Sequence, residues 1–418
     1  SQSIIIKQGS GATVTIANGQ TKAIYSDGAG SGGAMVDAFQ DLSIPDLFID
    51  DDLTVGDDLI VNGDIDLEGS IDVNGTANLD VVDIDVSLTV DGTVKLNGNF
   101  PTGTDNVALG NAALSGGSLS GAGNIAIGDS VGSGITSGSN AVAIGRDALG
   151  GVYTGGDAIA IGRSALASLT SGNFNVAVGS LAGTALTTGS SNTAVGFEAL
   201  KTEDAHGRNT AMGYQALKTL NAGAEAVTTT IGYLAGTSLT TGVQNTLIGG
   251  LSGDALTDAD YNVAVGNNTL SADTKGNRSV AIGYEALATQ NFSTSTDTHN
   301  VAVGNVAGAA ITTGIRNTLI GSGAGNALTD ADLNVAVGRD ALTSDTLGSQ
   351  SVAIGTNALA NQNYTTATNS LNTAVGHSAG SSVTTGIQNT LIGGQAGDAL
   401  TDADFNVAVG YQALTNDT

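Results

Sequence analysis

The sequence repeats one five-residue motif, NVAVG, letter for letter at five separate places. In every copy an Asn comes first, an Ala third and a Gly last. These shared positions are Asn175, Ala177 and Gly179; Asn262, Ala264 and Gly266; Asn300, Ala302 and Gly304; Asn334, Ala336 and Gly338; and Asn406, Ala408 and Gly410. A catalytic site needs its motif once, whereas a structure built by stacking needs it once per layer. We therefore interpret these residues as parts of a structural repeat.

A relaxed form of the motif occurs eighteen times, with terminal glycines from Gly110 to Gly410. Successive terminal glycines are most often 17 residues apart, and the exceptions are 18, 19 and 21. A longer period of 72 residues relates Gly232, Gly304 and Gly376, so four short repeats form one duplicated unit. The segment LTDAD keeps the same slot in each unit, at 256–260, 328–332 and 400–404. This double regularity predicts a repeat architecture.

Each motif is typical of a short β-strand in which the two Val side chains point to one face and the Ala to the other. The Gly permits a turn with positive φ, and a weaker motif ending in Ala-Leu follows, as at Ala199 and Leu200. We predict two strands and two turns in each coil of about 17 residues. Stacking these coils about 4.8 Å apart gives an all-β solenoid of roughly 85 Å, in which recurring Asn residues bond from layer to layer. Helix is disfavoured because Gly interrupts every candidate.

Both faces of the predicted strands are apolar, which implies that both are covered. One face fills the inside of its own coil. Self-association of the chain covers the other, because each layer of one copy then meets the same layer of its neighbours. We therefore expect an oligomer. A three-fold arrangement is one closed solution, although the pattern does not dictate the number of copies.

Composition and charge exclude several classes of function. A formal net charge of -27 opposes binding to phosphate backbones, so we expect no nucleic-acid partner. The chain has no Cys, hence no disulfide and no thiolate metal site. No apolar run approaches about 18 residues, so we expect no membrane insertion. No motif indicates a cofactor, and we expect none.

Several segments resemble the repeats of known fibre proteins. NTAVGFEAL at 192–200, SVAIGYEAL at 279–287 and NVAVGYQAL at 406–414 are similar to repeats in tail-fibre proteins of marine and cyanobacterial phages. SVAIG, present at Ser279 and Ser351, also resembles the head repeats of YadA-type trimeric autotransporter adhesins. The resemblance covers residues 105–418. It implies a left-handed parallel β-roll assembled as an elongated trimer.

The preceding residues resemble the proximal parts of such fibres. Residues 1–45 contain an Asn18-Gly19 turn between two β-rich runs, which predicts a hairpin in a small β-domain. Residues 46–100 turn about every six residues, like the narrow shafts of phage fibres, and a proline flanks each end. We therefore predict an N-terminal attachment or joining domain (1–45), an acidic β shaft (46–100) and a β-roll (101–418).

The shaft carries fourteen Asp or Glu residues between Asp46 and Asp91, without a Lys or Arg among them. One interpretation is binding of Ca²⁺ between chains. The other is a solvated acidic surface with Asp favoured in turns, since no segment matches a Ca²⁺-binding loop. We assign no metal ligand.

Further candidate residues lie in the loops of the β-roll. The two Asp residues of each LTDAD could serve glycoside hydrolysis, but they recur with the repeat, as turn residues do. His206, His299 and His377 show no triad partner and are interpreted as surface residues, so we assign no catalytic residue. Two long loops, 289–300 and 361–372, each carry one aromatic residue in the same place. These aromatics, Phe292 and Tyr364, either contact a receptor or fold down over a coil edge.

These features favour a non-enzymatic structural fibre of a phage virion, a tail fibre that displays host-binding surface and mediates adsorption through many weak contacts. Such a fibre is extracellular on the virion. It joins tail or baseplate proteins through its N-terminal region and contacts a receptor or glycan on the host cell. The alternatives are a trimeric bacterial surface adhesin, an ice-binding solenoid that uses rows of Thr, and a depolymerase tailspike.

Overall fold

The computed structural model describes residues 2–7, 9–18, 22–26, 34–37, 59–62, 65, 104–116 and 119–416. The chain divides into two compact units, Ser1–Thr89 and Val90–Thr418, each of which is treated by itself below. The predicted shaft at 46–100 lies almost wholly outside the described residues, so its architecture stays a prediction. Every regular element in the described part of the chain is a β-strand. This part contains no helix of the length and apolarity that a membrane crossing requires.

The first unit contains two antiparallel strand pairs. Strand β1 (Ile4–Lys7) pairs with β2 (Thr13–Ile16), and β3 (Ile24–Ser26) pairs with β4 (Met35–Asp37). Among the described residues β2 pairs with the strand before it and β3 with the strand after it, whereas Gly19 lies outside the described residues, so the predicted turn at Asn18-Gly19 stays a prediction. A turn signal is local, whereas the pairing of a strand depends on which partner completes its ladder.

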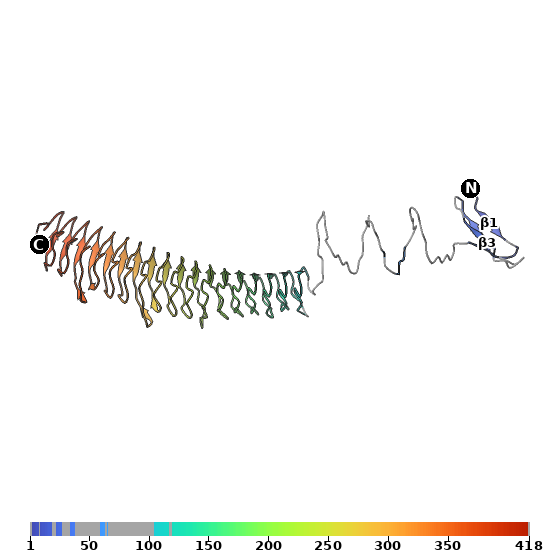
Figure 1. The fold of residues 1–418 in the computed structure, drawn as a ribbon, viewed down its shortest axis with the longest axis horizontal. Coiled ribbons are helices and arrows are strands. Elements are labelled where there is room, and N and C mark those ends of the chain that lie inside the picture. The colour runs from blue at the N-terminus through green and yellow to red at the C-terminus, as the bar shows by residue number, and fades with distance from the viewer. Residues whose placement is uncertain are drawn as a thin grey trace. The chain divides into compact units, whose positions relative to one another are not determined.

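The second unit is a parallel β-solenoid (Figure 1), which confirms the predicted fold class. Its main sheet contains eighteen strands, one after each motif Asn or its substitute, and each strand pairs in register with the next along the chain. Strands β5 and β26 are the two ends, because each pairs with one neighbour. The eighteen strands are β5 (Val107–Leu109), β6 (Ile125–Ile127), β7 (Val142–Ile144), β8 (Ile159–Ile161), β9 (Val176–Val178), β10 (Thr193–Val195), β11 (Thr210–Met212), β12 (Thr229–Ile231), β13 (Thr246–Ile248), β14 (Val263–Val265), β16 (Val280–Ile282), β18 (Val301–Val303), β19 (Thr318–Ile320), β20 (Val335–Val337), β22 (Val352–Ile354), β24 (Thr373–Val375), β25 (Thr390–Ile392) and β26 (Val407–Val409).

The coil differs from the expected one in its second half. Each strand of the main sheet has three residues, and the Ala-Leu motif forms a turn instead of a second strand. Both side chains of that motif are buried in the coil, as those of Ala199 and Leu200 are. The backbone of Leu200 has a φ of 49°. Two buried apolar residues in sequence looked like a strand, but positive φ is incompatible with one.

Two further strand pairs form beside the longest coils. Strand β15 (Gly276–Asn277) pairs in parallel with β17 (Thr296–Asp297), and β21 (Gly348–Ser349) pairs with β23 (Thr368–Asn369). Both pairs are produced by the 21-residue spacings, whose extra residues give the loop enough backbone for a second ladder.

The core of the solenoid is a stack of small side chains. The central residue of each strand from β6 to β26 points inward and is buried, and in most strands it is Ala. The motif glycines are explained by the distance between layers. Gly266 has a φ of 140°, and a Cβ atom placed on it would lie 2.5 Å from the carbonyl oxygen of Gly283 in the next coil. A side chain there would separate the layers.

The recurring Asn residues form the predicted ladder inside the coil. Asn262 is fully buried, and its backbone N–H donates to Oδ1 of Asn245 at 2.9 Å. Its Nδ2 donates to the carbonyl of Gly276 at 2.9 Å. Amide side chains thus satisfy buried backbone groups where the chain leaves the turn and enters the strand. Ser, Thr or Ala replaces Asn in this slot at Ala141, Ala158, Thr228, Ser279 and Ser351.

Candidate functional site

The outer face of the eighteen-strand sheet is uncharged along its whole length and mostly apolar. We define the outer apolar face as the first and third residues of each of the eighteen strands. These positions hold Val, Ile, Leu, Met or Thr, and no charged residue. Many of the side chains are partly exposed, such as Ile282 at 37 %, Ile320 at 40 % and Ile392 at 40 %. A continuous apolar face of this kind is a feature of interaction surfaces.

Aromatic residues flank this face in sequence. Phe197, Tyr214 and Tyr233 each follow a motif Gly in three successive coils, and their rings stack with centroids 5.4 and 5.5 Å apart. Before the strands, Tyr261 lies under the guanidinium of Arg278 at 5.0 Å. These four aromatic side chains are exposed, so the residues next in sequence to the outer apolar face add aromatic surface.

The two aromatic residues of the long loops lie inside the coil. Phe292 is 7 % exposed and Tyr364 is 5 % exposed. The hydroxyl of Tyr364 donates to the carbonyl of Gly386 at 2.7 Å. Their burial agrees with the alternative in which the aromatic folds down over a coil edge, and the receptor contact stays a prediction.

The LTDAD carboxylates bind the preceding coil. Oδ1 of Asp260 accepts a hydrogen bond of 2.8 Å from the backbone N–H of Val243, and Oδ1 of Asp258 accepts one of 2.7 Å from the hydroxyl of Thr241. The equivalent bonds recur at Asp332, Asp330 and Asp404. These contacts are those of turn and ladder residues, as the repeat period predicts.

The Thr rows have a similar internal role. The hydroxyls of Thr170, Thr240 and Thr257 donate to backbone carbonyls one coil further on, at 2.9 to 3.1 Å. The same bond is made by Thr312, Thr329 and Thr384. A hydroxyl whose proton is held within the stack is not free to donate to ice, so this geometry does not favour the ice-binding alternative.

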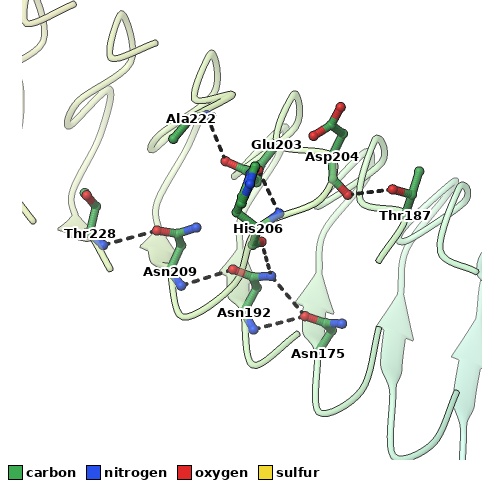
Figure 2. A network of polar contacts seen from close by, with 9 residues as sticks. All are labelled: Asn175, Thr187, Asn192, Glu203, Asp204, His206, Asn209, Ala222 and Thr228. Carbon is green, nitrogen blue, oxygen red and sulfur yellow. Dashed lines mark hydrogen bonds and ion pairs between the residues drawn. The ribbon is translucent and has the colours of Figure 1, made fainter. Parts of the chain in front are cut away.

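One coil carries a polar cluster that the others lack, at Glu203, Asp204 and His206 (Figure 2). Glu203 is fully buried. Its Oε1 accepts a hydrogen bond of 3.1 Å from the backbone N–H of His206 and lies 3.3 Å from the Nδ1 of the same residue. Its Oε2 accepts a bond of 3.3 Å from the N–H of Ala222 in the next coil. His206 is thus a partly exposed residue, as predicted, and the structure adds a contact with Glu203 that the sequence did not indicate.

Within the described residues this cluster is the one set of three His, Cys, Asp or Glu side chains that lie close enough to share a cation. The ligand atoms of all three are within 4.8 Å of one another. A surface hollow of about 220 Å³ opens beside it, lined by His206, Arg208, Glu225, Ser190, Ser191 and Thr188. Sequence reasoning missed the cluster because it considered each His alone.

His299 and His377, the other two histidines, are exposed as predicted.

No protein-family model, curated protein or solved structure matches this chain. The fold therefore defines the class by itself, and the chain is a repeat protein of the parallel β-solenoid type.

Proposed function

We propose that the chain is the structural fibre of a phage virion, assembled as a trimer through the outer apolar face. The observation that supports this most strongly is the composition of that face. The chain has a net charge of -27, yet none of the outward strand positions carries a charge. Charged residues are depleted at the centres of stable interfaces in the same way.

The size of the face is also sufficient. If each of the outward side chains in eighteen strands buried about 50 Å², one copy would bury on the order of 1,800 Å², more than the ~800 Å² per partner of a standard interface. Parallel association in register places identical layers side by side, so the aliphatic rows of neighbouring copies meet along the stack.

A fibre of this kind acts mechanically. The interlayer hydrogen bonds and close glycine contacts make each coil rigid relative to the next. A stack of eighteen coils presents the same surface many times, so several weak contacts with a host receptor or glycan reinforce one another. The N-terminal unit would join the tail or baseplate of the particle.

The first test is the mass of the purified chain in solution by light scattering. We expect about 123 kDa, three copies of the 40.9 kDa chain. A mass near that of one chain would contradict the trimer.

The second test separates a virion fibre from a cell-surface adhesin. Antibodies against the purified chain should label phage tails in electron micrographs, and excess free chain should slow particle adsorption to the host. Labelling of bacterial cells without labelling of particles would instead favour the adhesin.

A further inference from the structure

The duplicated units provide an internal comparison for the cluster at Glu203. Asp273 and Asp345 occupy the slot of Glu203, because each of the three residues lies seven positions after its motif glycine. All three carboxylates are fully buried. At Asp204 the other two units have Thr274 and Thr346, and at His206 they have Gly276 and Gly348. Glu, Asp and His thus occur together in one coil of the solenoid.

The two sister carboxylates are satisfied by an amide. Nε2 of Gln290 donates to Oδ2 of Asp273 at 2.5 Å, and Nε2 of Gln362 donates to Oδ2 of Asp345 at 2.6 Å. In the coil after Glu203 the Gln slot holds Leu220, which cannot donate a hydrogen bond. Removing the amide leaves Glu203 with backbone donors and one imidazole.

A fully buried carboxylate is paired with a cation, bound to a metal or, as in the two sister coils, satisfied by hydrogen bonds that include a side-chain amide. No Lys or Arg in the described residues forms an ion pair with Glu203, whose partner is His206. The nearby lysines 201 and 218 are instead held by Glu198, at 2.6 and 2.7 Å. The charge of Glu203 therefore lacks a permanent cationic partner.

We propose that Glu203, Asp204 and His206 bind one divalent transition-metal ion, of which Zn²⁺ is the best match. One imidazole nitrogen and two carboxylates are ligands that Zn²⁺ accepts, and their two negative charges neutralise the ion. Hard cations such as Ca²⁺ prefer six or more oxygen ligands, which this coil does not supply.

The geometry of Glu203 and His206 fits such an ion. Oε1 of Glu203 and Nδ1 of His206 are 3.3 Å apart. If the ion is about 2.1 Å from each of these two atoms, the ligand–ion–ligand angle is about 104°, close to the tetrahedral value of ~109°. Binding requires the tautomer with a free Nδ1 and the proton on Nε2, and a proton carried by Nδ1 in the metal-free chain is released to solvent.

Neighbouring coils hold the backbone of the ligand residues in place. The carbonyl of Asp204 accepts a bond of 2.8 Å from the hydroxyl of Thr187, and the carbonyl of His206 accepts one of 3.1 Å from Nδ2 of Asn192 (Figure 2). His206 also lines the surface hollow, so that this ligand residue borders solvent. Such support from a second layer of hydrogen bonds is typical of metal sites.

The test uses the full chain purified without a histidine tag and freed of metal with a chelator. Titration with Zn²⁺ by calorimetry should show one equivalent per chain. Co²⁺ should give the visible absorption of a four-coordinate site. Two variants restore the residues of the sister coils, Asp204→Thr and His206→Gly, and each should weaken binding about tenfold or more.

The matched control is His377→Asn, which removes an exposed His elsewhere and should leave the affinity unchanged. Glu203→Asp places in this slot the residue of the sister coils, so it changes the glutamate without removing the buried carboxylate on which folding depends. Circular dichroism of every variant verifies the fold. The proposal is overturned by absence of Zn²⁺ binding, by binding that the Asp204 and His206 variants do not weaken, or by several equivalents of equal affinity, as a diffuse acidic surface would give.

Discussion

The Oδ1 atom of Asn262 accepts a hydrogen bond of 2.8 Å from the backbone N–H of Ser279, which lies one coil further along the solenoid. Its Nδ2 donates to the carbonyl of Gly276, the first residue of β15 in the same neighbouring layer. One buried side chain thus satisfies two backbone groups that belong to another layer. The ladder holds coils together at the point where the parallel sheet begins.

Asn262→Ala should leave both backbone groups unsatisfied and lower the free energy of unfolding by about 2 to 4 kcal/mol. Denaturant unfolding measures the loss in free energy of unfolding. Faster hydrogen exchange at the amide of Ser279 shows that the loss arises at the broken ladder bond. The control is Asn363→Ala, since that Asn is exposed and accepts one bond of 3.0 Å from Thr346. Equal effects of the two substitutions would show that the ladder bonds do not stabilise the fold.

Gly266→Ala should disrupt the stack more severely, by more than ~3 kcal/mol. The new Cβ would meet the carbonyl of Gly283 at 2.5 Å, and Ala does not readily adopt a φ of 140°. Gly223→Ala is the matched control, because no atom lies within 4 Å of its Cβ position. Thermal unfolding and limited proteolysis compare the two, and a Gly266 variant as stable as the Gly223 variant would contradict the close-contact explanation.

The motif glycines predicted every strand of the eighteen-strand sheet, because a close contact between layers permits no other residue and leaves a strict period in the sequence. The length of the strands and the turn at Ala-Leu were not predictable in this way. A Leu that points inward from a turn, like Leu200, is indistinguishable in sequence from one that points inward from a strand. Its backbone conformation is decided by the layers above and below it.

The candidate site shows the opposite relationship. Glu203 and His206 are three residues apart, and their sequence alone resembles a solvated loop. The informative signal was the departure of this coil from the 72-residue pattern, in which Thr and Gly stand at the places of Asp204 and His206. Burial of Glu203 depends on the whole coil and could be seen in the structure alone.

The outer apolar face predicts the effect of added charge on assembly. Ile320→Lys combined with Ile354→Lys should reduce the mass in solution from that of a trimer to that of one chain, because two charges per copy would be buried at the interface. The fold of each copy should change little, since these side chains are already 40 % and 38 % exposed. Ser293→Lys adds a charge in an exposed loop and should leave the mass unchanged. A trimer that survives the double substitution would place the interface elsewhere.

Tyr364 tests whether the long loops have a packing role. Tyr364→Phe reproduces the residue of the sister loop and should cost about 1 kcal/mol, the value of its bond to Gly386. Tyr364→Ala should cost about 3 to 5 kcal/mol, because it leaves a cavity under the loop. Denaturant unfolding distinguishes the two. A Tyr364→Ala variant of unchanged stability that no longer binds host cells would favour the receptor-contact interpretation.

The buried carboxylates predict how stability depends on pH. Burial raises the pKa of Asp273 and Asp345 above the ordinary value of 3.8, so the folded state favours their protonated forms. Their contribution to stability is fully present below 3.8 and is lost as the pH rises through the raised folded pKa. Glu198 has the opposite sign, because hydrogen bonds from Lys201 and Lys218 lower its pKa to about 2. Its contribution is lost as the pH falls from its ordinary value of 4.5 toward about 2.

The Glu198 window ends at pH 4.5, and Asp254, whose pKa is also raised by burial, is present in the native chain and in a variant at the other two positions. The difference between such a variant and the native chain, measured by denaturant unfolding between pH 4.5 and 7.5, therefore reports Asp273 and Asp345. The native chain should lose stability relative to the double variant Asp273→Asn and Asp345→Asn as the pH rises through this range. The variant carries no charge at either position. Any change in stability caused by the new amides themselves is the same at every pH, so it does not alter how the free energy of unfolding changes with pH. Parallel pH profiles for the two proteins would show that both carboxylates ionise in the folded state as easily as in the unfolded one.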